Sequence, residues 1–208
     1  MSELNKNITQ WKLPLYKVYT DDEDLSLISK IIRRGNNWAM GPEIEEFENS
    51  IKNYLGVDYC VTLNSGTSSL HAAFLAYDIK PQDEIIIPSF SFIATANSVL
   101  FVDAKPIFAD IEEDTFGLSK ESVLKNISKK TRAIVPMDYG GLPCKFHSSE
   151  NDFMDQNILV IEDAAEAFGA SFNNKKVGTT ADSSIFSFCG NKVLTTGEGG
   201  CLVTNSKK

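Results

Sequence analysis

Seven short apolar runs, most of them separated by segments with helical patterning, restrict the possible folds of this chain more than any other feature. Most runs are continuous rather than alternating, as is typical of strands covered on both faces. Helices are predicted between the early runs, at Ser68–Asp78, Phe92–Val102 and Lys120–Ile127. This order predicts a three-layer α/β/α fold with a mostly parallel sheet, which binds ligands at the carboxyl ends of its strands. The runs are Tyr59–Leu63, Glu84–Pro88, Pro106–Ala109, Ala133–Met137, Ile158–Ile161, Ser184–Phe188 and Cys201–Thr204.

Two more helices are expected before the first run. Asp21 can cap the first helix and Gly35 can end it, while Pro42 can occupy the first turn of the second helix. We therefore predict that residues 1–55 form an N-terminal helical segment that packs on a domain of residues 56–208. No repeat or low-complexity linker divides the second of these ranges.

Composition and charge restrict the class of partner. The chain has 208 residues, a hydrophobic fraction of 42% and a formal net charge of −8. The negative charge argues against nucleic acid or an anionic membrane surface as the main partner. No apolar run reaches the roughly 20 residues that cross a bilayer, and the first residues lack the apolar core of a signal peptide. We therefore expect a cytoplasmic protein.

Cysteine and histidine spacing gives no sign of a metal site. No CxxC pair and no helical HxxxH pair occurs. We expect reduced thiols and no bound metal. The residues concerned are Cys60, Cys144, Cys189, Cys201, His71 and His147.

A candidate phosphate site follows the first run. Gly66, Thr67 and Ser68 lie where a strand ends and a helix begins. Free backbone N–H groups at a helix start, together with two hydroxyl groups, suit a phosphate. Taken alone, such a segment is more often an ordinary turn with a serine cap. It has neither the Walker lysine nor GxGxxG spacing, so a nucleotide loop fits poorly.

Two other strand ends carry an aromatic residue and a carboxylate. Phe92 follows the second run and could stack on a flat heterocycle, although a core phenylalanine is the more common case. Asp163 closes the run Ile158–Ile161, and Glu166 lies one helical turn further on. An aspartate in this position is about as readily explained by a helix cap as by a catalytic or binding group.

Lys192 has the most informative surroundings. It lies between the strand-like run that contains Ser187 and a glycine-rich turn, TTGEGG. A lysine amine can form a Schiff base with a carbonyl group, and a carboxylate such as Asp163 can hold a protonated pyridine nitrogen. Ser187 could reach the same phosphate as Thr67. Each signal is weak alone, but together these strand ends predict a site for pyridoxal 5′-phosphate (PLP).

The chain resembles the PLP-dependent sugar aminotransferases of the DegT/DnrJ/EryC1/StrS family from about Leu13 to its end. The resemblance implies the large domain of the type I aminotransferase fold. It also implies that Lys192 forms the Schiff base, that Asp163 binds the pyridine nitrogen and that Glu166 lies beside the 3-hydroxyl group. Phe92 would stack on the ring, and Gly66, Thr67, Ser68 and Ser187 would bind the phosphate. Matching segments include NSGTSSLHAA, IIPSFSFIATANSV, VIEDAAEAFGA and FSFCGNKVLTTGEGG.

GNK together with DAAEA is most similar to perosamine-synthase-like members of the family. This implies transfer of an amino group, with glutamate as donor, to C4 of a nucleotide-linked 4-keto-6-deoxy sugar for polysaccharide or glycan biosynthesis. It also implies a homodimer with shared active sites. The resemblance further implies that family members continue past the position of Lys208 into a small C-terminal domain, which we expect to be absent from this chain. We therefore expect the cofactor site here, but not the whole substrate site.

Three other functions compete with this interpretation. The first is a protein that binds PLP but does not catalyse transamination. The second is C3 dehydration, although relatives with that activity have histidine in place of the lysine at Lys192. The third is a generic doubly wound nucleotide-binding module, which the absence of a dinucleotide or Walker loop disfavours.

Overall fold

The computed structural model describes residue 13 and residues 16–148, 153 and 157–207. The chain divides into two units, Met1–Asn36 and Asn37–Lys208. The first unit contains helix α1 (Asp22–Arg34), which begins at a capping box formed by Asp21 and ends at Gly35 in the left-handed conformation. These are the predicted bounds. The expected packing of residues 1–55 as one segment stays a prediction.

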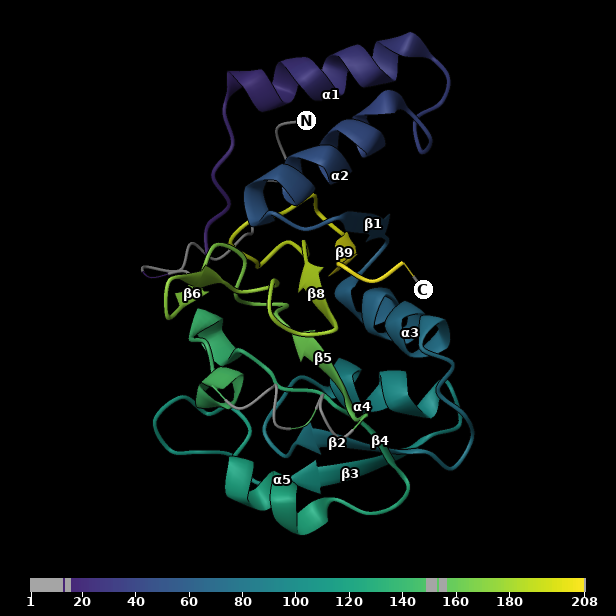
Figure 1. Cartoon of the computed structure of the whole chain (residues 1–208). Coiled ribbons are helices and arrows are strands. Elements are labelled where there is room, and N and C mark those ends of the chain that lie inside the picture. The colour runs from purple at the N-terminus through teal and green to yellow at the C-terminus, as the bar shows by residue number, and fades with distance from the viewer. Residues whose placement is uncertain (1–12, 14–15, 149–152, 154–156, 208) are drawn as a thin grey trace. The chain divides into compact units, whose positions relative to one another are not determined.

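A seven-stranded sheet in the order β1-β9-β8-β5-β4-β2-β3 forms the centre of the second unit (Figure 1). The strands from β8 to β3 run parallel, whereas β9 is antiparallel to both β1 and β8. The expected mostly parallel sheet is confirmed. The strands are β1 (Tyr59–Leu63), β2 (Glu84–Pro88), β3 (Lys105–Ala109), β4 (Thr131–Ile134), β5 (Leu159–Asp163), β8 (Ser183–Ser187) and β9 (Gly200–Thr204).

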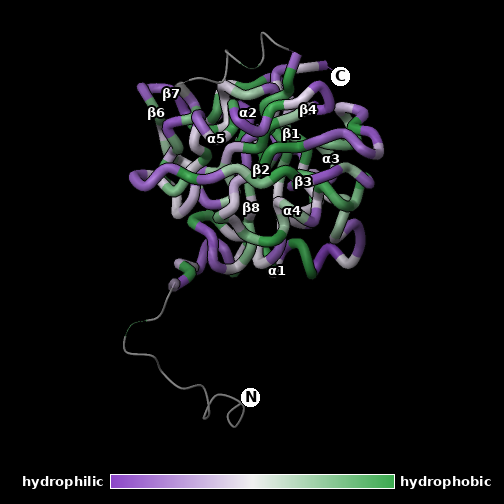
Figure 2. The backbone as a smooth tube through the Cα atoms, turned by 90° about the horizontal axis from the view of Figure 1, so that it is seen from below, coloured by the Kyte–Doolittle hydropathy of each residue, from purple (hydrophilic) through white to green (hydrophobic). Residues whose placement is uncertain are grey.

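Successive residues of the strands enter different cores, which explains the continuous apolar runs. Ile85 and Ile87 of β2 pack in one cluster with Leu70 and Phe74, whereas Ile86 packs in another with Val123. The first cluster lies under α3 (Gly66–Ala76) and α4 (Ile93–Leu100), and the second lies under α5 (Lys120–Asn126). Figure 2 shows hydrophobic stretches concentrated in the interior of this unit. The expected α/β/α layers are therefore confirmed.

Helix α2 (Pro42–Leu55) belongs to this second unit. Its N1 position is the predicted proline, and Gly56 ends it in the left-handed conformation. Ile51 and Leu55 pack against Phe186 and Phe188 in a third apolar cluster. The helix therefore covers the β8–β9 part of the sheet, on the face away from α3 and α4.

Short elements between β4 and β8 were not predicted. They are the 3-10 turns η1 (Tyr139–Gly141) and η2 (Lys145–Ser148) and the hairpin of β6 (Ser171–Phe172) and β7 (Lys175–Lys176). Asn173 and Asn174 connect the hairpin with φ values of 48° and 63°. Asparagine tolerates this conformation, which two-residue hairpin turns require. No helix in the described part of the chain has the length and apolar character of a membrane span.

Candidate active site

A cavity of about 260 Å³ lies where β2, β5 and β8 reach their carboxyl ends. Seven of the eight predicted site residues line it: Gly66, Thr67, Phe92, Asp163, Glu166, Ser187 and Lys192. Ser68 does not. Its hydroxyl oxygen lies 3.0 Å from Ser65 Oγ, and its backbone N–H donates to the same oxygen. The structure thus gathers residues that lie up to 126 positions apart in the sequence, and the predicted role of Ser68 stays a prediction.

The start of α3 forms one wall of the cavity. Ser65 is its N-cap, and its side chain accepts a hydrogen bond from the backbone N–H of Ser68. The 11-residue helix presents its partial positive charge and free N–H groups at this end. Ser187 of β8 packs close by, because a Cβ atom on Gly66 would lie 3.0 Å from Ser187 Cβ. This corner of the cavity suits an anion.

Gly200 at the start of β9 allows the strand to approach α3. A Cβ atom at this position would lie 2.5 Å from the carbonyl carbon of Ser65 and 2.6 Å from the nitrogen of Gly66. Gly200→Ala is therefore expected to displace the helix start, to destabilise the fold by about 1–3 kcal/mol and to weaken phosphate-ligand binding. Thermal melting and PLP titration measure the two effects. Gly190→Ala is the matched control, because its Cβ atom would meet nothing nearer than 3.8 Å; equal losses in both variants would contradict this account.

Asp163 is buried at the end of β5. Thr95 Oγ1 donates a hydrogen bond of 2.8 Å to Asp163 Oδ2, and the backbone N–H of Ala165 donates one of 3.2 Å to Oδ1. Burial raises the pKa of Asp163, while the two hydrogen bonds and the charge of Lys192 oppose that shift. A cationic group in the cavity would favour the charged carboxylate further.

Lys192 and Glu166 form an ion pair at the cavity wall. Lys192 Nζ lies 3.1 Å from Glu166 Oε1, and the backbone N–H of Gly140 donates to Glu166 Oε2 at 2.7 Å. The lysine backbone is held by a turn in which its N–H donates to the carbonyl of Cys189 at 3.0 Å. The amine therefore has a fixed carboxylate partner, in a loop fastened to the end of β8.

Phe92 lies at the opening of the cavity, at the N-cap of α4. The residue is 69% exposed, so it is not the core phenylalanine that the sequence also allowed. A ring in this position can cover one face of a flat ligand.

The residues that line the cavity but were not predicted as site residues include Ser65, Thr95 and Met137. Ser65 could have been identified as the N-cap, because it precedes the helix that was expected near Ser68. Thr95 lies one turn after Phe92, but its partner Asp163 is 68 positions away, and no local pattern connects the two.

The donor set fits a ligand that carries a phosphate and a protonatable ring nitrogen. Backbone N–H groups and hydroxyl groups gather at Ser65–Thr67 and Ser187, a buried carboxylate is available at Asp163, and an amine at Lys192. The sequence model of the DegT/DnrJ/EryC1/StrS aminotransferase family matches residues 19–208. The chain belongs to this family.

The chain is also similar to individual proteins. The chain is 42% identical to GDP-perosamine synthase of Caulobacter vibrioides over 167 residues, which are 80% of this chain and 45% of that protein. An aminotransferase from Psychrobacter cryohalolentis superposes with a TM-score of 0.88 at 31% identity, over 94% of this chain and 49% of the other. The chain thus spans about half the length of the relatives that it matches.

A solved structure that this chain resembles contains the cofactor. It is an Escherichia coli GDP-4-keto-6-deoxy-D-mannose-3-dehydratase with bound hydrated PLP, which superposes with a TM-score of 0.86 at 27% identity over 93% of this chain and 51% of that one. This agreement supports the expected fold of a PLP-dependent enzyme's large domain.

Proposed function

We propose that this chain binds PLP and forms the cofactor half of an aminotransferase that acts on a nucleotide-linked keto sugar. The observation that carries the proposal is the single cavity that joins the start of α3, the buried Asp163 and the amine of Lys192. The family membership and the relatives named above support the same class of reaction.

Each residue has a role that follows from its position. The α3 start, with Thr67 and Ser187, holds the phosphate, and Phe92 covers the ring. Asp163 keeps the ring nitrogen protonated, because a buried carboxylate next to a cation favours the charged pair. PLP, when bound, withdraws electrons from the substrate carbon. Lys192 then carries the proton to and from that carbon, as a positioned amine can.

The proposal also covers the identity of the sugar substrate and of the amino donor. We propose a GDP-linked sugar as substrate, because a relative at 42% identity is a GDP-perosamine synthase. Amination at C4 of a 4-keto-6-deoxy sugar, with glutamate as donor, is proposed from the sequence resemblance given above. Because the chain spans about half of its relatives, we further propose that other substrate contacts come from residues outside it and from the second subunit of a homodimer.

A half-reaction with glutamate tests the proposal. Protein saturated with PLP is expected to lose its visible absorbance when L-glutamate is added and to release one equivalent of 2-oxoglutarate. The variant Lys125→Ala is expected to react like the unmodified protein, because that lysine is exposed on α5 and pairs only with Glu121 among the contacts described. A bound chromophore without 2-oxoglutarate would instead support the non-catalytic PLP-binding alternative.

A further inference from the structure

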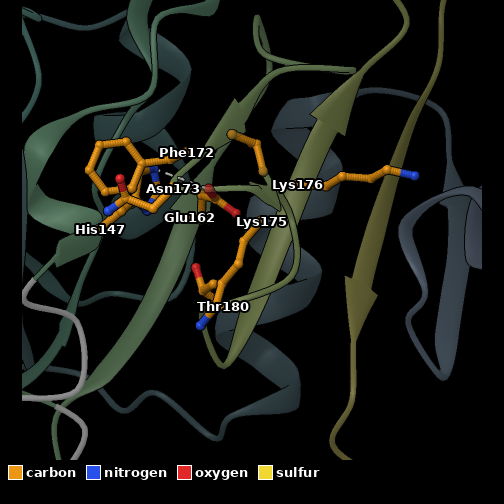
Figure 3. Close-up of a pocket in the computed structure, with 8 residues that line it drawn as sticks. His147, Glu162, Phe172, Asn173, Lys175, Lys176 and Thr180 are labelled. Atoms are coloured by element: carbon orange, nitrogen blue, oxygen red, sulfur yellow. Dashed lines mark ion pairs between the residues drawn. The ribbon is translucent and has the colours of Figure 1, made fainter.

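A second group of chemically reactive side chains lies behind the cofactor cavity. Successive residues of a strand point to opposite faces, so Glu162 points away from the cavity that Asp163 lines. Glu162 and His147 line a separate cavity of about 100 Å³ beside the β6–β7 hairpin (Figure 3). Asp138 and Cys144 lie against the same imidazole. These four residues are called the rear cluster below.

The geometry of the rear cluster brings different donor types together. One donor atom each from Asp138, Cys144 and His147 lies within 4.8 Å of the other two. His147 Nε2 is 2.7 Å from Asp138 Oδ1 and 3.3 Å from Glu162 Oε1. Figure 3 marks the contact between His147 and Glu162. Imidazole, thiol and carboxylate groups are the ligands that zinc prefers.

Both carboxylates are held in place by their other contacts. Glu162 Oε2 accepts hydrogen bonds from the backbone N–H of Gly178 at 2.8 Å and from Ser184 Oγ at 2.5 Å. Asp138 Oδ1 accepts one from the backbone N–H of Cys144 at 2.9 Å. Such outer contacts orient metal ligands in known sites. They leave Glu162 Oε1 directed at the imidazole.

Asp138 supplies a second, independent sign of a ligand. Its side chain is fully buried, and its Oδ2 atom has no hydrogen-bond partner among the described groups. A buried carboxylate oxygen without a partner is costly. Glu162 adds another carboxylate with a side-chain exposure of 1%. A divalent cation held by these side chains would give Asp138 and Glu162 a positively charged partner.

We propose that the rear cluster binds one Zn²⁺ ion through Asp138, Cys144, His147 and Glu162. The imidazole would bind the ion through Nε2 as its neutral tautomer with the proton on Nδ1, and the thiol of Cys144 would release its proton to solvent on binding. It joins the loop that follows β4 to the end of β5. Its role is structural, because it fixes the segments that carry Met137 and Asp163 on the opposite face.

Metal content and a cobalt spectrum test the site directly. The purified protein is stripped with chelator, loaded with PLP and titrated with Zn²⁺ or Co²⁺. We expect one metal ion per chain, a thiolate-to-cobalt charge-transfer band and a higher melting temperature with Zn²⁺. Failure of the unmodified protein to bind the metal stoichiometrically, or a cobalt spectrum without the thiolate band, overturns the proposal without any variant being needed.

Variants assign the ligands. Cys144→Ala and His147→Gln are expected to lose the metal, whereas Cys60→Ala and His71→Gln, which alter the same residue types outside the cluster, are expected to retain it. Ser184→Ala removes a contact that orients Glu162 and should weaken metal binding by about 10–100-fold. Retention of zinc in both Cys144→Ala and His147→Gln would contradict the site. PLP absorbance in each variant separates this result from a failure of the proposed function.

Discussion

Replacement of Lys192 by alanine is expected to abolish the visible absorbance of the PLP complex and to reduce turnover by at least 10²–10⁴-fold. Lys192 is the lysine that lines the cavity. A lysine amine can join a carbonyl carbon covalently, and the expected range is that of a lost general acid–base catalyst. The loop should keep its shape, because the turn that holds Lys192 uses backbone atoms of Lys192 and Cys189. Absorbance scans and a transamination assay measure both effects.

Lys125→Ala again serves as the control, because it removes an exposed lysine of α5. Its absorbance and turnover should match those of the unmodified protein. Turnover that persists in Lys192→Ala above one hundredth of the normal rate would show that another group performs the proton transfer.

Asp163→Asn is expected to have opposite effects on the cofactor-free and the cofactor-bound protein. Burial raises the pKa of Asp163 above its ordinary value of 3.8. A raised pKa in the folded state favours folding at low pH, and this contribution is lost as the pH rises through the folded-state pKa. Above that pH, cofactor-free Asp163→Asn should melt at a higher temperature than the unmodified protein. The difference should disappear as the pH falls toward 3.8 and below.

With PLP bound, Asp163→Asn should instead melt at a lower temperature than the unmodified protein, because the protonated ring nitrogen loses its charged partner. Loss of one hydrogen bond to a charged group costs roughly 1.5–3 kcal/mol, so PLP affinity should fall by about 10–100-fold. Melting curves with and without PLP between pH 4 and pH 8 measure both effects. An exposed carboxylate offers the matched control, Asp110→Asn, which should change neither. Unchanged PLP affinity in Asp163→Asn would remove this residue from the cofactor site.

The layered fold could be predicted because its signals are local. Continuous apolar runs such as Glu84–Pro88 record burial on both faces, and caps such as Asp21 and Gly35 mark helix ends. The antiparallel placement of β9 between β1 and β8 could not be predicted, because the pairing of Thr62 with Cys201 depends on contacts between distant segments. The two-residue strands of the β6–β7 hairpin are too short for an apolar pattern.

The candidate site also has a part that the sequence predicts and a part that it does not. Glycine, serine, threonine and lysine residues at strand ends could be predicted as site residues, because the apolar pattern of a strand shows where the strand ends. Thr95 and the rear cluster could not be predicted in this way, because Thr95 contacts Asp163 and His147 contacts Glu162, which lie in β5. Glu162 follows the apolar run Ile158–Ile161 directly, and only the alternation of side chains along β5 places it on the other face from Asp163. The CxxC and HxxxH spacings did not indicate the proposed zinc site, because three of its donors, Asp138, Cys144 and His147, lie in one loop at other spacings and the fourth, Glu162, lies in β5.

Reductive trapping tests the central claim most directly. The purified protein is saturated with PLP, treated with borohydride and digested, and the peptides are identified by mass spectrometry. The account predicts a single pyridoxyl-modified residue, Lys192, in the peptide that follows β8. Protein that stays colourless and unlabelled, or a label that maps to a different lysine, would contradict it.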